Sequence, residues 1–131
     1  MSDHTHEELV EAWIRFSNAD RSSEEYDKYF WAFLTLLELE REDPNQTWQL
    51  IVDVWSRDQS DKTISYLFAG HLENLLSYHG PEVIEKVEQK AKADPKFANA
   101  LGCIWKFQMT DEIWARVQKV WDRRGWDGIP N

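Results

Sequence analysis

The chain has 131 residues, of which 42% are hydrophobic and 14% aromatic, so it is long enough and apolar enough to bury the core of one domain. Its formal net charge is −9, and the whole excess of negative charge lies in residues 1–62, which hold 15 acidic and 6 basic side chains. Because such a surface repels phosphate backbones, the charge argues against direct nucleic-acid binding.

Two helices are predicted near the start of the chain from their capping residues. Thr5 with Glu8, and Ser22 with Glu25, fit the capping box, in which a hydroxyl and a carboxylate each accept a backbone N–H at a helix start. Thr110 is predicted to cap the last helix. Between these caps, apolar residues recur at helical spacing, and no segment shows the alternation that is typical of a strand.

Two aspartates, each followed by proline, are predicted to open further helices. Asp43 and Asp94 supply a capping carboxylate, and proline is tolerated at the first helical position because its missing N–H is not needed there. The two aspartates are 51 residues apart, and each precedes a tryptophan, Trp55 or Trp105. This echo indicates stacked helical hairpins, a short HEAT-like α-superhelix. A compact helical bundle fits the same pattern.

The predicted fold is therefore all-α, with about seven helices in one domain over residues 1–131. Gly80 followed by Pro81 is expected to end one helix before the next begins. Residues 1–5 and 126–131 are expected to be flexible ends. Six tryptophans fall on or beside the apolar stripes, and we expect them in the core: Trp13, Trp48, Trp55, Trp105, Trp114 and Trp121.

The cellular setting is predicted from what the chain lacks. A single cysteine, Cys103, excludes an internal disulfide and favours a reducing compartment. Residues 1–8 contain no apolar segment of a secretory signal, and the longest apolar stretch, residues 29–37, is too short to span a bilayer. We therefore expect a cytoplasmic protein that does not bind membranes.

The segment from Ala69 to Gly80 reads AGHLENLLSYHG. It resembles an uncharacterised bacterial all-helical domain family with a core of the form A-G-x-L-E-x-L-L-x-x-H-G, and the wider similarity covers roughly residues 40 to 121. The resemblance implies a bacterial, helical domain. It implies no activity.

The histidines and Glu73 are the residues from which a chemical site would be built. His71 and His79 are too far apart along a helix to share a metal ion, and no HxxxH or HExxH spacing occurs. We expect His71 to be buried and bonded to a neighbouring helix, and His79 to bond carbonyls at a helix end. Glu73, beside the small Gly70, faces a groove or bonds an adjacent helix end. We predict no metal, no cofactor and no catalytic residue.

The candidate partner-binding residues combine tryptophans with acidic side chains. Trp31 lies off the apolar stripe of its helix, and Trp126 follows a helix-ending glycine, so either is a candidate anchor at a protein interface. Acidic residues near a helix C-terminus oppose the helix dipole, which hints at a cationic partner. With Glu73, the predicted contact residues of this kind are Glu38, Glu40, Glu42 and Asp43.

Three classes of function fit these features. The first is a non-catalytic acidic protein-binding module, such as an immunity protein or inhibitor that neutralises a basic toxin or nuclease. The second is a nucleic-acid mimic with an anti-defence role, which requires carboxylates in spaced rows. The third is an enzyme or small-molecule-binding domain that uses Glu73 and the histidines. We expect the first.

Overall fold

The structure, a computed structural model, describes residues 4–123. Within these residues it contains helices and no strand, which confirms the predicted all-α fold. Two of the helical segments are not α-helices: η1 is a π-helix and η2 a 3-10 helix. The elements in chain order are α1 (His6–Asn18), α2 (Glu24–Glu42), α3 (Pro44–Arg57), α4 (Asp61–Tyr66), η1 (Leu67–Leu72), α5 (Glu73–Ala93), α6 (Pro95–Ala100), η2 (Leu101–Cys103) and α7 (Asp111–Val120).

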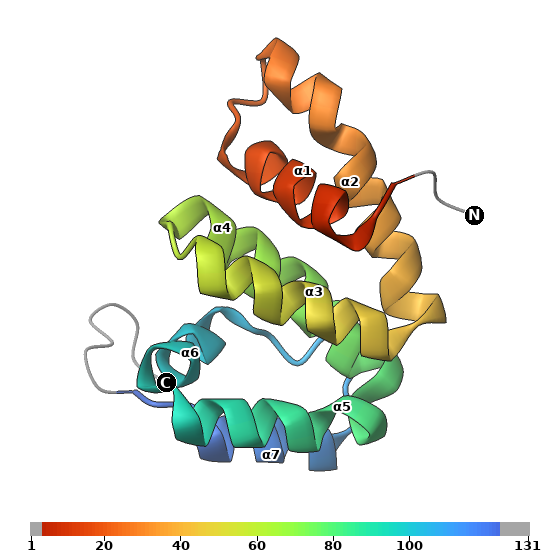
Figure 1. Cartoon of the computed structure of the whole chain (residues 1–131). Helices are drawn as coiled ribbons and strands as arrows, with labels where there is room; N and C mark the ends of the chain where they lie inside the picture. Colours follow the sequence, from red (N-terminus) through yellow and green to blue (C-terminus); the bar gives the residue numbers. More distant parts are fainter. Residues whose placement is uncertain (1–3, 124–131) are drawn as a thin grey trace.

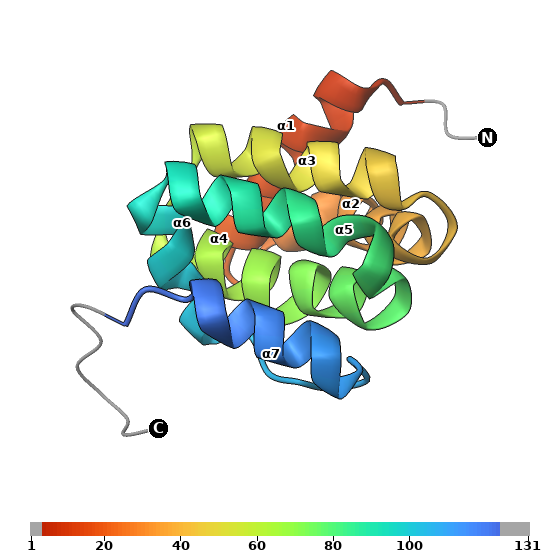
Figure 2. The same ribbon diagram turned by 90° about the horizontal axis from the view of Figure 1, so that it is seen from below.

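The helices pack in three tiers (Figure 1). The upper tier is α1 with α2, the middle tier is α3 with α4, and the lower tier holds α5 and α7 with α6 at one end. Seen from below, α7 lies against α5, and α5 in turn covers the middle tier (Figure 2). The result is a compact bundle, one of the two predicted arrangements.

Most of the predicted helix starts are confirmed. Thr5 caps α1 in a capping box with Glu8, as predicted. Asp43, Asp94 and Thr110 cap α3, α6 and α7 as predicted. The second cap is Ser23 and not Ser22, because the Ser23 hydroxyl is the one placed to accept the Tyr26 N–H, at 3.1 Å.

The predicted helix end before Gly80 and Pro81 is confirmed. His79 has a non-helical backbone conformation (φ −134°, ψ 33°), so α5 consists of two helical stretches that meet at a kink there. Gly80 serves packing: a β-carbon there would lie 2.9 Å from the Ile113 side chain of α7. Its small size therefore lets α7 dock on α5 at the bend.

The core is rich in aromatic rings. Trp55, Phe68 and Phe97 pack edge to face or tilted against one another, with ring centroids 5.1 to 5.6 Å apart. Trp13 is also fully buried. Three more of the predicted core tryptophans pack against the core from partly exposed positions: Trp48, Trp114 and Trp121.

Candidate functional site

The loop between η2 and α7, residues 104–110, presents two aromatic side chains to solvent; we call it the aromatic loop. Trp105 is 77% exposed and Phe107 is 52% exposed. Among residues 4–123 these are two of the three large hydrophobic side chains that are exposed, the third being Leu34 on α2. Large aromatic side chains are the kind of residue that protein interfaces use as anchors.

The prediction that Trp105 lies in the core is wrong because the helix that should carry it ends early. α6 stops at Ala100, a single 3-10 turn follows, and Ile104 has an extended backbone (φ −90°, ψ 138°). Ile104 stays buried, at 5% exposure, and the next residue therefore points the other way.

Two side chains of α5 hold the aromatic loop. The Glu73 carboxylate accepts the Trp105 backbone N–H at 2.7 Å, and the Ser77 hydroxyl accepts the Gln108 N–H at 3.3 Å. Glu73 and Ser77 are four residues apart and so lie on one face of the helix. The Met109 side chain, only 4% exposed, packs into the hydrophobic core. The loop is thus fastened at both ends to a packed helix.

Phe107 has an unusual backbone conformation. Its φ of 47° lies in the left-handed region, where a bulky side chain is disfavoured. The turn around it is closed by a hydrogen bond from the Met109 N–H to the Lys106 carbonyl, at 2.9 Å. Strain of this kind persists only where the surroundings impose it, and it is concentrated at functional sites.

Glu73, one of the predicted contact residues, therefore acts as a support for the loop. Burial raises the pKa of its carboxyl above the usual 4.5, and the hydrogen bond from the Trp105 backbone opposes that shift. The alternative in which Glu73 bonds an adjacent segment is the one observed. Negative charge near the loop comes instead from Asp111 and Glu112, both exposed in the first turn of α7, where Lys106 pairs with Asp111.

The acidic cluster at the end of α2 is only partly on the surface. Glu38 and Glu42 are exposed. The Asp43 carboxylate caps α3, where it accepts the Gln46 N–H. Glu40 is only 1% exposed, so its prediction as a surface contact is wrong. Residues two apart on a helix point about 200° away from each other, which turns Glu40 inward when Glu38 faces solvent.

Glu40 belongs to a buried chain of hydrogen bonds that joins three elements. Trp13 of α1 donates its indole N–H to His71 Nε2 at 2.9 Å, and His71 Nδ1 lies 2.5 Å from a Glu40 carboxylate oxygen. Because an indole N–H can only donate, Nε2 accepts, and Nδ1 carries the proton that is shared with Glu40. The expectation that His71 is buried and bonded to a neighbouring helix is confirmed, and the bond satisfies the buried carboxylate.

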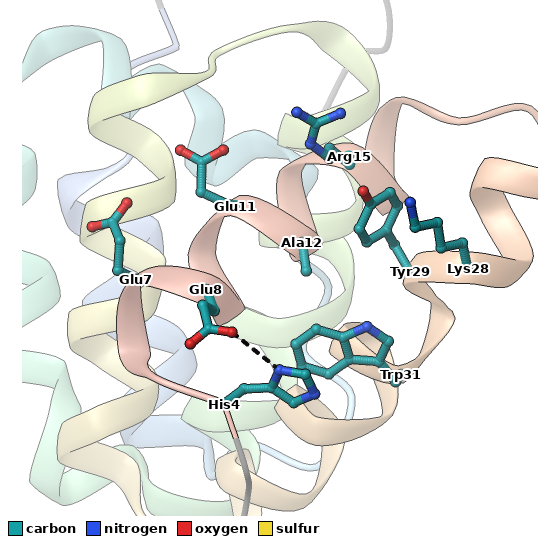
Figure 3. A pocket seen from close by; sticks show the side chains of 9 residues that line it. All are labelled: His4, Glu7, Glu8, Glu11, Ala12, Arg15, Lys28, Tyr29 and Trp31. Carbon is teal, nitrogen blue, oxygen red and sulfur yellow. Dashed lines mark hydrogen bonds and ion pairs between the residues drawn. The ribbon is translucent and has the colours of Figure 1, made fainter.

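Trp31 is partly exposed and packs against the core, so it is less free than predicted. His4 stacks on its ring with centroids 3.8 Å apart and bonds Glu8, as Figure 3 shows. Trp31, His4 and Glu8 line an open groove between α1 and α2, with a volume of about 430 Å³. Its walls also carry Glu7, Glu11, Ala12, Arg15, Lys28 and Tyr29.

The remaining predicted residues are placed as follows. His79 Nε2 lies 2.7 Å from the carbonyl oxygen of Arg41, at the end of α2. His79 therefore bonds a carbonyl at the end of a neighbouring helix and not at the end of the helix that carries it. Cys103 is half-buried, and burial raises the pKa of its thiol. Trp126 lies outside the described residues. Among residues 4–123, no three His, Cys, Asp or Glu side chains gather closely enough to hold a metal ion.

No described helix combines the length and the apolar character needed to cross a membrane. Comparison with known proteins found one family, described as a family of unknown function (DUF6869), whose model matches residues 19–125. No curated protein and no solved structure matches the chain. The family match extends further toward the N-terminus than the resemblance in the sequence, and it brings no activity. Since the matched residues make up most of the chain, the protein belongs to this family.

Proposed function

We propose that the chain is a non-catalytic protein-binding module that contacts its partner through the aromatic loop. The observation that carries the proposal is the fixed exposure of Trp105 and Phe107. Interfaces draw most of their binding energy from a few aromatic or arginine anchors, and anchors that are already held in place lose little entropy on binding. Glu73 and Ser77 provide that support here.

The charge around the loop favours a partner with a basic rim. Glu112 is exposed in the first turn of α7, which follows the loop, and Asp111 before it is paired with Lys106; the net charge of the chain is −9. Opposite charge on the partner speeds association, whereas the aromatic anchors slow dissociation. An immunity protein or inhibitor that neutralises a basic toxin or nuclease is the form of such a module that this charge favours. We infer a bacterial, cytoplasmic setting, which the lone Cys103 supports.

The two alternatives have less support. A domain that binds or transforms a small molecule with Glu73 and the histidines would need those groups available. Glu73, His71 and His79 are instead each bonded to another part of the fold. A nucleic-acid mimic needs rows of exposed carboxylates, and the burial of Glu40 interrupts the row on α2.

The test begins with a photo-crosslinking amino acid placed at position 105 or 107, in cells that express the full chain. A matched control carries the same amino acid at Glu24, which is exposed at the start of α2 in the upper tier (Figure 1). We expect one protein to be captured from positions 105 and 107 and not from position 24.

The captured protein is then titrated against purified variants. Trp105→Ala and Phe107→Ala should each weaken its binding by tenfold or more, the loss of about 1.4 kcal/mol or more that is typical of an interface anchor. Glu24→Ala serves as the control. Unchanged affinity in both loop variants would contradict the proposal.

A further inference from the structure

A second hollow lies beside η1, between α2 and α4, and we call it the η1 groove. Its volume is about 580 Å³, within the range of about 300–1,000 Å³ that is usual for small-ligand sites. The residues that line it and carry the argument are Arg21, Phe33, Lys62, Tyr66, Ala69 and Gly70. It shares none of its lining with the aromatic loop.

The floor of the η1 groove is a preformed aromatic surface. Phe33 and Tyr66 are half-buried, and their ring centroids lie 6.4 Å apart at an angle of 70°. Behind them is Phe16, which is only 1% exposed and whose ring lies 5.2 Å from Phe33 and 5.6 Å from Tyr66. A ligand would therefore meet rings that are already fixed, at little cost in side-chain entropy.

Gly70 has no role in the fold that alanine could not fill. A β-carbon added to it would meet no atom within 4 Å, and its φ lies outside the left-handed region. Gly80 is the contrasting case, since Ile113 fills the space where its β-carbon would be. Glycine weakens a helix relative to alanine, so the open space over Gly70 comes with a loss of stability. Room for a bound molecule is a physical reason for it.

The helix type at this place is also unusual. Gly70 lies in a π-helix, a form that occurs mostly as single turns and is frequent at functional sites. The buried side of η1 is fixed by His71, which bonds Trp13 and Glu40. On the other side, the residues of η1 that line the groove are Ala69 and Gly70.

The charges at the edge of the η1 groove differ from those of the surrounding surface. Arg21 and Lys62 line it with Asp61, a balance of one positive charge. Residues 1–62, in contrast, hold 15 acidic and 6 basic side chains. The Lys62 ammonium lies 3.4 Å from Asp20, but both side chains are exposed, so an anion can compete for it.

We propose that the η1 groove binds a small organic anion with an apolar body, of the aryl or acyl carboxylate class. The apolar body would pack on Phe33 and Tyr66 and pass over Gly70, where the missing β-carbon leaves room. The anionic group would lie at the edge, toward Arg21 and Lys62. This binding is independent of the protein contact proposed for the aromatic loop.

The experiment uses two fluorescent probes of similar shape. 8-Anilinonaphthalene-1-sulfonate carries the anionic group, and N-phenyl-1-naphthylamine lacks it. Titrated into the folded full chain, the anionic probe should bind at one saturable site and at least threefold more tightly than the neutral one. Decanoate should displace it at lower concentrations than decanol does.

Two kinds of variant locate the site. Gly70→Leu fills the groove and should weaken both probes by tenfold or more. Arg21→Glu with Lys62→Glu should weaken the anionic probe by a similar factor and leave the neutral probe within twofold. The matched control, Arg15→Glu with Lys28→Glu, makes the same change in net charge at the α1–α2 groove and should change neither affinity.

Several results would overturn the proposal: no saturable binding of the anionic probe, equal affinity for both probes, or equal losses in the double variant and its control. Circular dichroism reports whether Gly70→Leu folds. If it does not, the comparison of the two double variants decides alone. Gly70→Ala gives a further check, since it should raise the melting temperature while weakening both probes.

Discussion

The two segments that open with Asp-Pro begin alike and end differently. Asp43 accepts the Gln46 N–H at 3.1 Å, and Asp94 accepts the Phe97 N–H at the same distance. The first segment then continues as α3 and buries Trp55 to 1% exposure, whereas the second leaves helix after Ala100 and leaves Trp105 77% exposed. Equal beginnings thus lead to a core residue in one case and a contact residue in the other.

The difference arises from what packs on each segment. α3 packs against α1, α2 and α5, so these neighbours cover the apolar side chains along the helix. The second segment meets the end of the last helix: a β-carbon on Gly102 would lie 2.8 Å from the Trp121 indole nitrogen. The Asp122 N–H also bonds the Ala98 carbonyl at 3.1 Å. The two segments therefore share their capping residue and differ in the tertiary contacts of their later parts.

The largest expected effect compares the two tryptophans directly. Trp55→Ala should lower the free energy of unfolding by about 3–5 kcal/mol, because it empties a packed core site. Trp105→Ala should change it by no more than about 0.5 kcal/mol, as is usual at exposed positions. Urea denaturation followed by circular dichroism measures both. A loss of several kcal/mol in the Trp105 variant would mean that this ring is buried.

The next effect separates the two aspartates. Asp94 also accepts the Trp55 indole N–H, at 2.8 Å, in addition to capping α6. Asp94→Ala should therefore cost about 2–3 kcal/mol, the sum of a lost cap and an unsatisfied indole, against about 1 kcal/mol for Asp43→Ala. The same denaturation experiment applies, and equal losses would show that the bond to Trp55 contributes nothing.

A smaller effect of opposite sign is expected at Phe107. Glycine adopts positive φ without strain, so Phe107→Gly should stabilise the fold by about 1 kcal/mol while removing a proposed binding anchor. Calorimetry should show a melting temperature raised by a few degrees. Phe107→Ala, which keeps the strain, is the control. If both variants melt alike, the strain is absent.

The smallest effect concerns the support of the loop. Because burial raises the pKa of Glu73 in the folded state, the folded protein binds its proton more tightly, and ionising the group above that pKa lowers stability. Glu73→Gln keeps an oxygen acceptor for Trp105 and should be more stable at pH 7, by less than about 1 kcal/mol since solvent screens the group.

The advantage of the Glu73→Gln variant should fade as the pH falls through the raised pKa toward 4.5, where the wild-type carboxyl becomes protonated. Melting temperatures measured from pH 4 to pH 8 test this. A gap that widens at low pH would mean that the pKa of Glu73 is lowered instead.

Local signals in the sequence were sufficient for the fold and for part of the site. Capping residues and apolar spacing predict the helices, and the position of His71 within an apolar stripe predicts its burial. The burial of Glu40 also had a signal, since Ala32, Leu36 and Glu40 follow one another at four-residue spacing, and the first two are apolar.

The aromatic loop and the η1 groove were not predictable in this way. Trp105 and Phe107 are two residues apart, which does not fit one helix face, but the helix ends before them where Gly102 meets Trp121, a residue distant in the sequence. The η1 groove joins residues of α2 and α4 that are far apart in the sequence. Both features depend on long-range packing.

The π-helix has a consequence for chain length. Its wide turn holds one residue more than an α-helix would, and each residue advances a helix by about 100°. A relative with one residue fewer between Leu67 and Leu72 would therefore need only an ordinary α-turn there, and Glu73 and Ser77 would still face the aromatic loop. The fold should thus tolerate the loss of one residue from this segment, whereas the loss of one residue from a regular α-turn would rotate the following residues by about 100°.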